Sequence, residues 1–198
     1  MDQKKLGIGF IGAGEISILH GRAIRQIPNA YLVGLWNRTE STAKRRGKEE
    51  GCKVYKTPEE LVSDSDIGAV IICTNLETHL PFARLAMEAG KHVLVEKPIC
   101  SSVAEVEEMK AVAEQTGRLC VPGHNMIHEE SLRRARRLIV NGDIGQMVVY
   151  FKAPHMIVGC HLIGNPARVA EELALLRLLE QRVASHLYFE WPLPLTIV

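Results

Sequence analysis

A short glycine turn, Gly12-Ala13-Gly14, separates an apolar run from a helical pattern near the start of the chain. Leu6–Ile11 before the turn has the character of a buried strand, and apolar residues recur at helical spacing over Ile16–Ile27. Gly12 permits a tight strand-to-helix turn, and Gly14 lets the backbone approach a pyrophosphate at the positive end of the helix. The turn therefore predicts a dinucleotide-binding strand and helix.

The glycine motif is incomplete, because its third position holds Ser17 in place of glycine. Serine is small enough to let the helix pack closely on the strand. Glu15 and Ile16, in the first helical turn, join the glycines as expected cofactor-binding residues. The alternative, that the glycines form only a tight turn, stays open.

Strands and helices alternate over the first 124 residues. This alternation, with short connections, predicts an α/β fold with a doubly wound parallel sheet of the Rossmann type. The expected strands are Leu6–Ile11, Tyr31–Trp36, Lys53–Tyr55, Ala69–Cys73, His92–Val95 and Leu119–Val121. Capping boxes at Thr57 and Ser102 predict two helix starts. The helix after Ser102 is expected to bury Val103, Val106, Met109 and Val112.

Composition excludes several classes of protein. Of 198 residues 46% are hydrophobic, and 24 basic against 23 acidic residues give a net charge of +1. Such a balance is untypical of disordered chains and of nucleic-acid binders. The cluster Arg133–Arg137 lies within an expected amphipathic helix, Glu129–Val140, and is interpreted as its solvated face. No run approaches the ~20 apolar residues that span a bilayer, so neither nucleic acid nor membrane is expected as a partner.

The cysteines and the N-terminus favour a cytoplasmic protein. Five scattered cysteines without a CxxC pair argue against a disulfide framework and against a zinc site, so no metal is expected. Lys4 and Lys5 precede an apolar run as in a signal peptide. Glycines interrupt that run and Glu15 ends it without a cleavage site, which disfavours secretion.

The residues after the second strand, Asn37-Arg38-Thr39, bear on the choice of cofactor. An NAD site usually has a carboxylate here for the ribose hydroxyls. Without one, nothing repels a 2′-phosphate, and Arg38 can pair with it bidentately. The sequence therefore predicts NADP in preference to NAD. The alternative is a surface arginine at an ordinary helix start.

Six segments of the chain together match one family pattern. They are Ile11–Gly14 with His20, Ile72–Thr74, Glu77–His79, Ala89–Pro98, Gly123–Asn125 and Gly142–Gly145. In these segments the chain resembles the Gfo/Idh/MocA family, the glucose–fructose oxidoreductase and inositol dehydrogenase-like enzymes. The resemblance covers about residues 5–150 and is most specific in the run Ala89–Pro98.

The resemblance implies roles for particular residues. Lys97 matches a lysine beside the nicotinamide and the substrate hydroxyl, where a partly desolvated lysine can relay a proton. Glu96 and Pro98 would shape its turn. The alternative for Lys97 is an exposed lysine at a strand end.

A second loop is implied to line the cofactor. It contains Cys73, Thr74, Asn75 and His79, and it departs from the family's Thr-Pro-Asn pattern because Asn75 and Leu76 occupy the last two positions. Asn125, after the sixth strand, is a further candidate for the cofactor site. His124 beside it can equally be a loop histidine with local hydrogen bonds.

Residues 125–198 are expected to be a remnant of the family's second domain, with a divergent tail after about residue 152. Only one strand of that domain, Met147–Phe151, is recognisable. The family's Gly-Gly segment with its Asp and His is not found, and His155 and His161 lack that context. The tail contains a leucine-rich pattern over 169–183 and an apolar, proline-broken end at 191–195.

The leading hypothesis is an NAD(P)-dependent oxidoreductase. It would transfer a hydride between a nicotinamide cofactor and a hydroxyl or carbonyl of a sugar-like or polyol substrate. A catalytically incomplete dinucleotide-binding module and a truncated fragment without independent function are the alternatives. Self-association into a homo-oligomer is left open, because the leucine-rich pattern could cover a sheet edge or join two copies.

Overall fold

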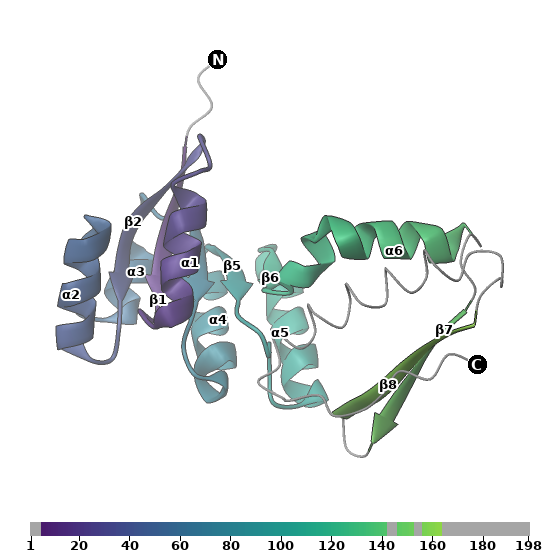
Figure 1. The fold of residues 1–198 in the computed structure, drawn as a ribbon. Coiled ribbons are helices and arrows are strands. Elements are labelled where there is room, and N and C mark those ends of the chain that lie inside the picture. Colours follow the sequence, from purple (N-terminus) through teal and green to yellow (C-terminus); the bar gives the residue numbers. More distant parts are fainter. Residues whose placement is uncertain (1–4, 142–145, 153–155, 164–198) are drawn as a thin grey trace. The chain divides into compact units, whose positions relative to one another are not determined.

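The computed structural model describes residues 5–141, 146–152 and 156–163, and it divides the chain into two compact units (Figure 1). The units are Met1–His124 and Asn125–Val198. The leucine-rich pattern over 169–183 and the apolar end at 191–195 lie outside the described residues.

The first unit is built on a six-stranded parallel sheet with strand order β3-β2-β1-β4-β5-β6. The strands are β1 (Leu6–Ile11), β2 (Ala30–Trp36), β3 (Lys53–Val54), β4 (Ala69–Ile72), β5 (His92–Val95) and β6 (Cys120–Pro122). The order reverses direction between β1 and β4, which is where doubly wound sheets bind ligands beyond their carboxyl ends. The Rossmann-type sheet predicted from the sequence is confirmed.

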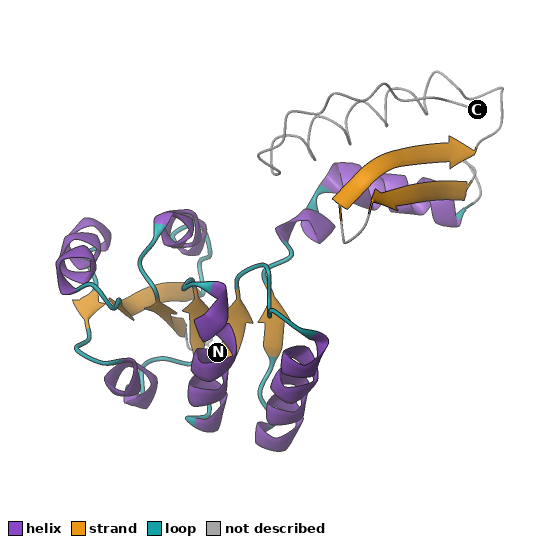
Figure 2. Cartoon of the chain, turned by 90° about the horizontal axis from the view of Figure 1, so that it is seen from below, coloured by secondary structure: helices purple, strands orange, loops and turns teal. Residues whose placement is uncertain are grey.

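Helices cover both faces of this sheet (Figure 2). They are α1 (Glu15–Ile24), α2 (Glu40–Glu50), α3 (Pro58–Ser63), α4 (His79–Glu88), α5 (Val103–Thr116) and the 3-10 turn η1 (Leu76–Thr78). One buried cluster joins the sheet to α1 and α2 through Ile24 and Ala43. The other joins it to α3, α4 and α5 through Leu61, Met87 and Met109. Both faces of the strands are therefore buried, as their continuous apolar runs require.

Both predicted capping boxes form. The Thr57 hydroxyl oxygen accepts the Glu60 amide at 3.1 Å, and the Ser102 hydroxyl oxygen accepts the Glu105 amide at 3.2 Å. These contacts satisfy amides that have no partner inside the helix.

The prediction of which residues α5 buries is confirmed for two of the four residues. Met109 and Val112 are buried, whereas Val103 and Val106 are 77% and 37% exposed. The reason is the position of α5 over the edge of the sheet. Since β6 is the last strand, α5 has a neighbouring helix in this unit on one side only, α4.

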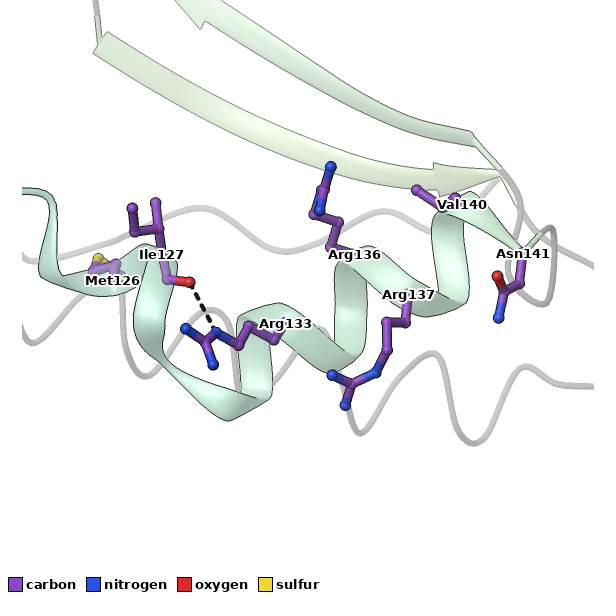
Figure 3. Close-up of a pocket in the computed structure, with 7 residues that line it drawn as sticks. All are labelled: Met126, Ile127, Arg133, Arg136, Arg137, Val140 and Asn141. Atoms are coloured by element: carbon purple, nitrogen blue, oxygen red, sulfur yellow. Dashed lines mark hydrogen bonds between the residues drawn. The ribbon is translucent and has the colours of Figure 1, made fainter.

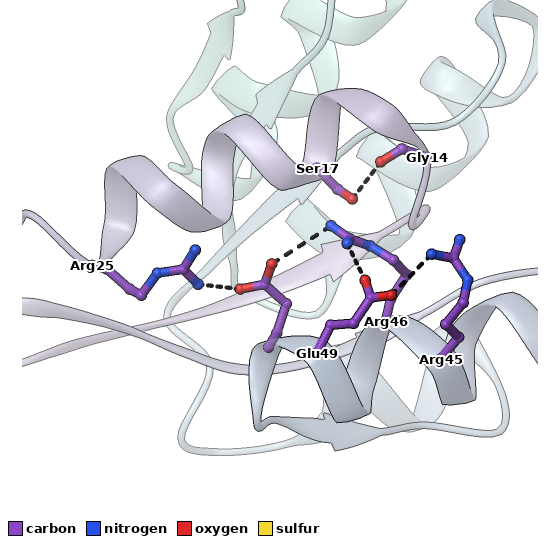
Figure 4. A network of polar contacts seen from close by, with 7 residues as sticks. Gly14, Ser17, Arg25, Arg45, Arg46 and Glu49 are labelled. Carbon is purple, nitrogen blue, oxygen red and sulfur yellow. Dashed lines mark hydrogen bonds and ion pairs between the residues drawn. The ribbon is translucent and has the colours of Figure 1, made fainter.

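A polar network joins α1 to α2 (Figure 4). The carboxylate of Glu50 pairs with Arg25, the C-cap residue of α1, and lies 3.5 Å from the guanidinium of Arg46. Both Glu50 and Arg46 side chains are only 5% exposed. Arg46 also pairs with Glu49, and its Nε has no hydrogen-bond partner among the described residues. Gly21 makes room for the network, since a Cβ there would lie 2.8 Å from the Glu50 carboxylate.

The side-chain carboxylate of Asp64, after α3, accepts three hydrogen bonds. Its donors are the Lys53 ammonium at 2.9 Å, the Tyr55 hydroxyl at 2.7 Å and the Asp66 amide at 2.9 Å. These bonds, that of Lys53 foremost, lower the pKa of Asp64 to about 2. The folded state therefore favours the ionised carboxylate more strongly than the unfolded chain does.

Acid is expected to weaken the first unit through Asp64. Because its folded pKa is depressed, its contribution is fully present above about pH 4 and is lost as the pH falls toward 2. Asp64→Asn should lower the free energy of unfolding by about 1–2 kcal/mol at pH 7 and flatten its pH dependence below pH 4. Urea unfolding across this range measures both effects. Asp66→Asn, which keeps the donating amide, is the control, and equal behaviour of the two variants would contradict the assignment.

The second unit contains the 3-10 turn η2 (Asn125–His128), α6 (Glu130–Val140) and two strands, β7 (Gln146–Lys152) and β8 (Met156–Ile163). The strands pair antiparallel. Only the first was expected, because β8 lies in the tail interpreted as divergent, and a single apolar run does not reveal an antiparallel partner. The arginines at 133, 134, 136 and 137 are exposed on α6. Within the described parts of the chain, no helix is long and apolar enough to cross a membrane.

Candidate cofactor site

The glycine turn lies very close to the backbone at the end of β4. Gly12 has φ +100°, and its amide donates to the Trp36 carbonyl at 2.8 Å. A Cβ on Gly12 would lie 2.7 Å from the carbonyl carbon and oxygen of Cys73. Both the backbone conformation and this close approach require glycine. The first sequence-predicted site residue therefore sets the distance between the β1 and β4 ends.

The N-terminus of α1 is open in front of Gly14. Gly14 is the N-cap residue, its added Cβ would meet nothing within 4 Å, and as a glycine it makes no side-chain capping bond to the helix. Glu15 is exposed and Ile16 half-buried beside it. The first-turn amides of a helix have no intrahelical acceptor and attract anions. The space and the donors fit a pyrophosphate.

Ser17 has the packing role expected of the third motif position. It is buried, and its hydroxyl donates to the Gly14 carbonyl at 2.6 Å. With Gly21 and Ile24 it forms the buried face of α1. The serine thus substitutes for glycine by hydrogen-bonding its hydroxyl within the turn.

The residues after β2 divide into one that holds the glycine turn and two that face outward. The side-chain oxygen of Asn37 accepts the Ala13 amide at 3.0 Å, and its nitrogen donates to the Thr39 carbonyl at 3.2 Å. Arg38 and Thr39 are exposed. Within the described residues, the Arg38 guanidinium forms no hydrogen bond or ion pair. The hydroxyl of Thr39 makes no capping bond to α2.

A buried histidine, His79, contacts the backbone of the loop that follows β4. Nδ1 of His79 lies 2.9 Å from the Pro98 carbonyl oxygen, and Nε2 lies 3.1 Å from that of Thr74. The Thr74 hydroxyl oxygen accepts the Thr78 hydroxyl at 2.8 Å, and Asn75 is exposed at the start of η1. His79, only 2% exposed, therefore ties the β4 and β5 loops together by its ring nitrogens.

Cys73 is the first residue of this loop, directly after β4. Its thiol is buried, and burial first and the charge of Glu96 second raise its pKa. A thiol in this state is a small apolar side chain and a poor nucleophile.

Lys97 follows β5 and is exposed, with a cis peptide bond to Pro98. Across the part of the chain that the structure describes, its ammonium has no hydrogen-bond or ion-pair partner. Glu96 beside it is buried, and one of its oxygens accepts the Lys97 amide at 3.0 Å. The other oxygen lies 2.8 Å from Nε2 of His20 on α1.

The structure brings most of the sequence-predicted residues to one edge of the sheet. The ends of β2, β1, β4 and β5, which are neighbours in that order in the sheet, carry them. Asn125 is the exception, because it begins η2 in the second unit. Sequence reasoning missed the contact between His20 and Glu96. His20 stands out only as part of the resemblance, and no local spacing connects residues so far apart.

A separate cavity of about 730 Å³ lies along η2 and α6 (Figure 3). Its lining residues are Met126, Ile127, Arg133, Arg136, Arg137, Val140 and Asn141. All belong to the second unit, and no residue predicted for the cofactor site is among them.

The sheet order, the open helix N-terminus after a glycine turn and the polar residues at the strand ends together define a Rossmann-type dinucleotide-binding domain. Residues 6–124 match the model of the Gfo/Idh/MocA family, an oxidoreductase family with an NAD-binding Rossmann fold. The chain belongs to this family.

The relatives are dehydrogenases and other oxidoreductases, and this chain spans less than half of their length. The chain is 29% identical over 140 residues to the myo-inositol 2-dehydrogenase of Thermotoga maritima, and 33% identical over 148 residues to the glucose-6-phosphate 3-dehydrogenase of Bacillus subtilis. These matches cover 70% and 73% of this chain and 42% of each relative. A crystal structure of scyllo-inositol dehydrogenase from Lactobacillus casei, with NAD(H) and scyllo-inositol bound, matches with a TM-score of 0.67 at 30% identity. That match covers 73% of this chain and 43% of the other.

Proposed function

We propose that the chain forms the cofactor-binding part of an oxidoreductase that prefers NADP to NAD. Its reaction would be hydride transfer between the cofactor and a hydroxyl or carbonyl group of a polyol or sugar-like substrate. The observation that carries the cofactor preference is the end of β2, where Arg38 is exposed and unpaired among the described residues and residues 37–39 include no carboxylate. The names of the relatives, which include inositol dehydrogenases, support the substrate class.

Three groups of residues would hold the dinucleotide. Gly12, Gly14 and the first-turn amides at Glu15 and Ile16 fit the pyrophosphate. Asn37, Arg38 and Thr39 would surround the adenosine ribose and its 2′-phosphate. Cys73, Thr74, Asn75, His79, Glu96 and Pro98 would form or support the loops on the nicotinamide side, with Asn125 as an additional candidate.

The bound nicotinamide would donate or accept the hydride. Lys97 would exchange a proton between its Nζ and the substrate oxygen, as a general base for the hydroxyl or a general acid for the carbonyl. In the described structure Lys97 is exposed, so the desolvation that favours a neutral amine would come from the bound substrate and cofactor. His79 and Glu96 would hold the two loops in place and take no part in the proton transfer.

The test is a titration of the full chain with NADPH and with NADH, followed by nicotinamide fluorescence. We expect tighter binding of NADPH, and Arg38→Ala should weaken it about 10- to 100-fold, since charge-assisted hydrogen bonds to the phosphate would be lost. NADH affinity should change little in this variant. Equal affinity for the two cofactors, or an unchanged preference in Arg38→Ala, would refute the proposed selectivity.

Two variants control this titration. Arg22→Ala removes an exposed arginine from the last turn of α1, far from its N-terminus, and should bind NADPH as the unaltered chain does. Gly14→Asp has room for its side chain but places a carboxylate where the pyrophosphate would lie. It should fold normally and bind neither cofactor.

A second candidate is a dinucleotide-binding module without turnover. It is favoured by the lack of the family's Gly-Gly, Asp and His pattern in residues 125–198. Fewer groups would then orient a substrate, and orientation supplies much of an enzyme's rate. NADPH binding without any oxidation of polyols by NADP would support this candidate over the enzyme.

A further inference from the structure

We infer that His20 is a positioning residue for the lysine turn, acting through the carboxylate of Glu96. The inference deepens the proposed function, on which the importance of Lys97 rests. The geometry itself concerns three residues of the first unit, His20, Glu96 and Lys97, and needs no ligand.

Glu96 uses its two oxygens in different directions. One accepts the backbone amide of Lys97 at 3.0 Å, and the other lies 2.8 Å from Nε2 of His20. A carboxylate that bonds the next residue's amide fixes the start of the turn, and the second bond restricts the carboxylate's rotation. The orientation of the Lys97 backbone is therefore linked to the imidazole.

The surroundings of Glu96 leave His20 as its main side-chain partner. The carboxylate is buried, and among the described residues no lysine or arginine forms an ion pair with it. Gly123 passes so close that a Cβ there would lie 3.3 Å from the carboxylate. Buried carboxylates are costly without hydrogen bonds. Loss of the imidazole would free one oxygen, and the carboxylate would turn away from the Lys97 amide to find another donor.

His20 itself is held in place on α1. Its ring meets the ring of the buried Phe10 edge-on, with centroids 6.4 Å apart. The same helix begins at Gly14, where the pyrophosphate would bind. One rigid element thus connects the phosphate end of the site to the turn that carries Lys97.

Amide hydrogen exchange of Lys97 tests this in the full chain without cofactor. In His20→Ala we expect the Lys97 amide to exchange about ten-fold faster and its proton resonance to move upfield, because the bond to the charged carboxylate is weakened. His20→Gln places an amide nitrogen near the position of Nε2 and should restore both values. Leu19→Ala, at the exposed neighbouring position, should change neither.

A purely structural role for His20 predicts a different pattern. Loss of packing on Phe10 would speed exchange across α1 and β1 while the Lys97 resonance stayed in place, and His20→Gln would give no rescue. Either result would overturn the inference. If His20→Ala does not fold, His20→Gln and His20→Asn carry the comparison, since the shorter amide does not span the distance to Glu96. Failure of the proposed function appears separately, as absence of NADPH binding in the titration above.

Discussion

Turnover is expected to fall about 10²- to 10⁴-fold when Lys97 is replaced by alanine, the usual contribution of a general acid–base group. Lys97 lies at the carboxyl end of β5, at the edge where the glycine turn and the β4 loop meet, and its ammonium is unpaired among the described residues. The residues proposed to hold the pyrophosphate are on other elements, so the affinity for NADPH should fall far less than kcat. Steady-state oxidation of a polyol by NADP, with the binding titration beside it, measures both.

Lys97→Arg separates proton transfer from simple attraction by a positive charge. Arginine keeps the charge but does not lose its proton in proteins, so this variant should be nearly as slow as Lys97→Ala. Lys110→Ala on α5 removes an exposed lysine away from the strand ends and serves as the control. Full turnover in Lys97→Arg would show that the charge alone is needed and that the proposed proton transfer is wrong.

The largest loss of stability is expected for Glu50→Ala. Glu50 is the buried carboxylate between Arg25 and Arg46 in the network that joins α1 to α2. Its removal leaves the buried guanidinium of Arg46 with only Glu49, which is partly exposed. Removing one partner of a buried ion pair lowers the free energy of unfolding by about 3–5 kcal/mol, because the remaining charge is uncompensated. The shift of the urea midpoint, followed by circular dichroism, measures this cost.

The matched control for this experiment lies on the same helix. Glu40 pairs with Lys44, and both side chains are more than two-thirds exposed. Solvent screens such a pair, so Glu40→Ala should leave the urea midpoint where it is. Equal shifts for Glu40→Ala and Glu50→Ala would mean that burial of the network contributes nothing.

The sequence predicted the sheet and most positions at its edge because those features depend on local patterns. Gly12 is required by a turn between adjacent elements, and the strands are continuous apolar runs. Burial at the sheet's margin was less predictable. Val103 follows the helical spacing of a buried face, yet only the strand order reveals that α5 covers an edge.

Within the site, side-chain partners were harder to predict than positions. His79 and His20 were found only through resemblance, and neither pattern nor spacing shows that one joins two loops and the other meets Glu96. Such contacts depend on how distant loops converge after the sheet has formed. Strand β8 escaped prediction for a similar reason, because only its antiparallel pairing with β7 in the folded chain identifies it as a strand.

The close approach of Gly12 to Cys73 has a consequence for the order of folding. β1 pairs with β2, next along the sheet and near in sequence, but also with β4, which is synthesised much later. Loop closure makes such distant pairings slow relative to local ones. We therefore expect the pyrophosphate cradle to be completed late, after the transition state for folding. A dinucleotide that binds only after these residues have come together would slow unfolding and leave the folding rate almost unchanged. The bound cofactor would then increase the kinetic stability of the native sheet.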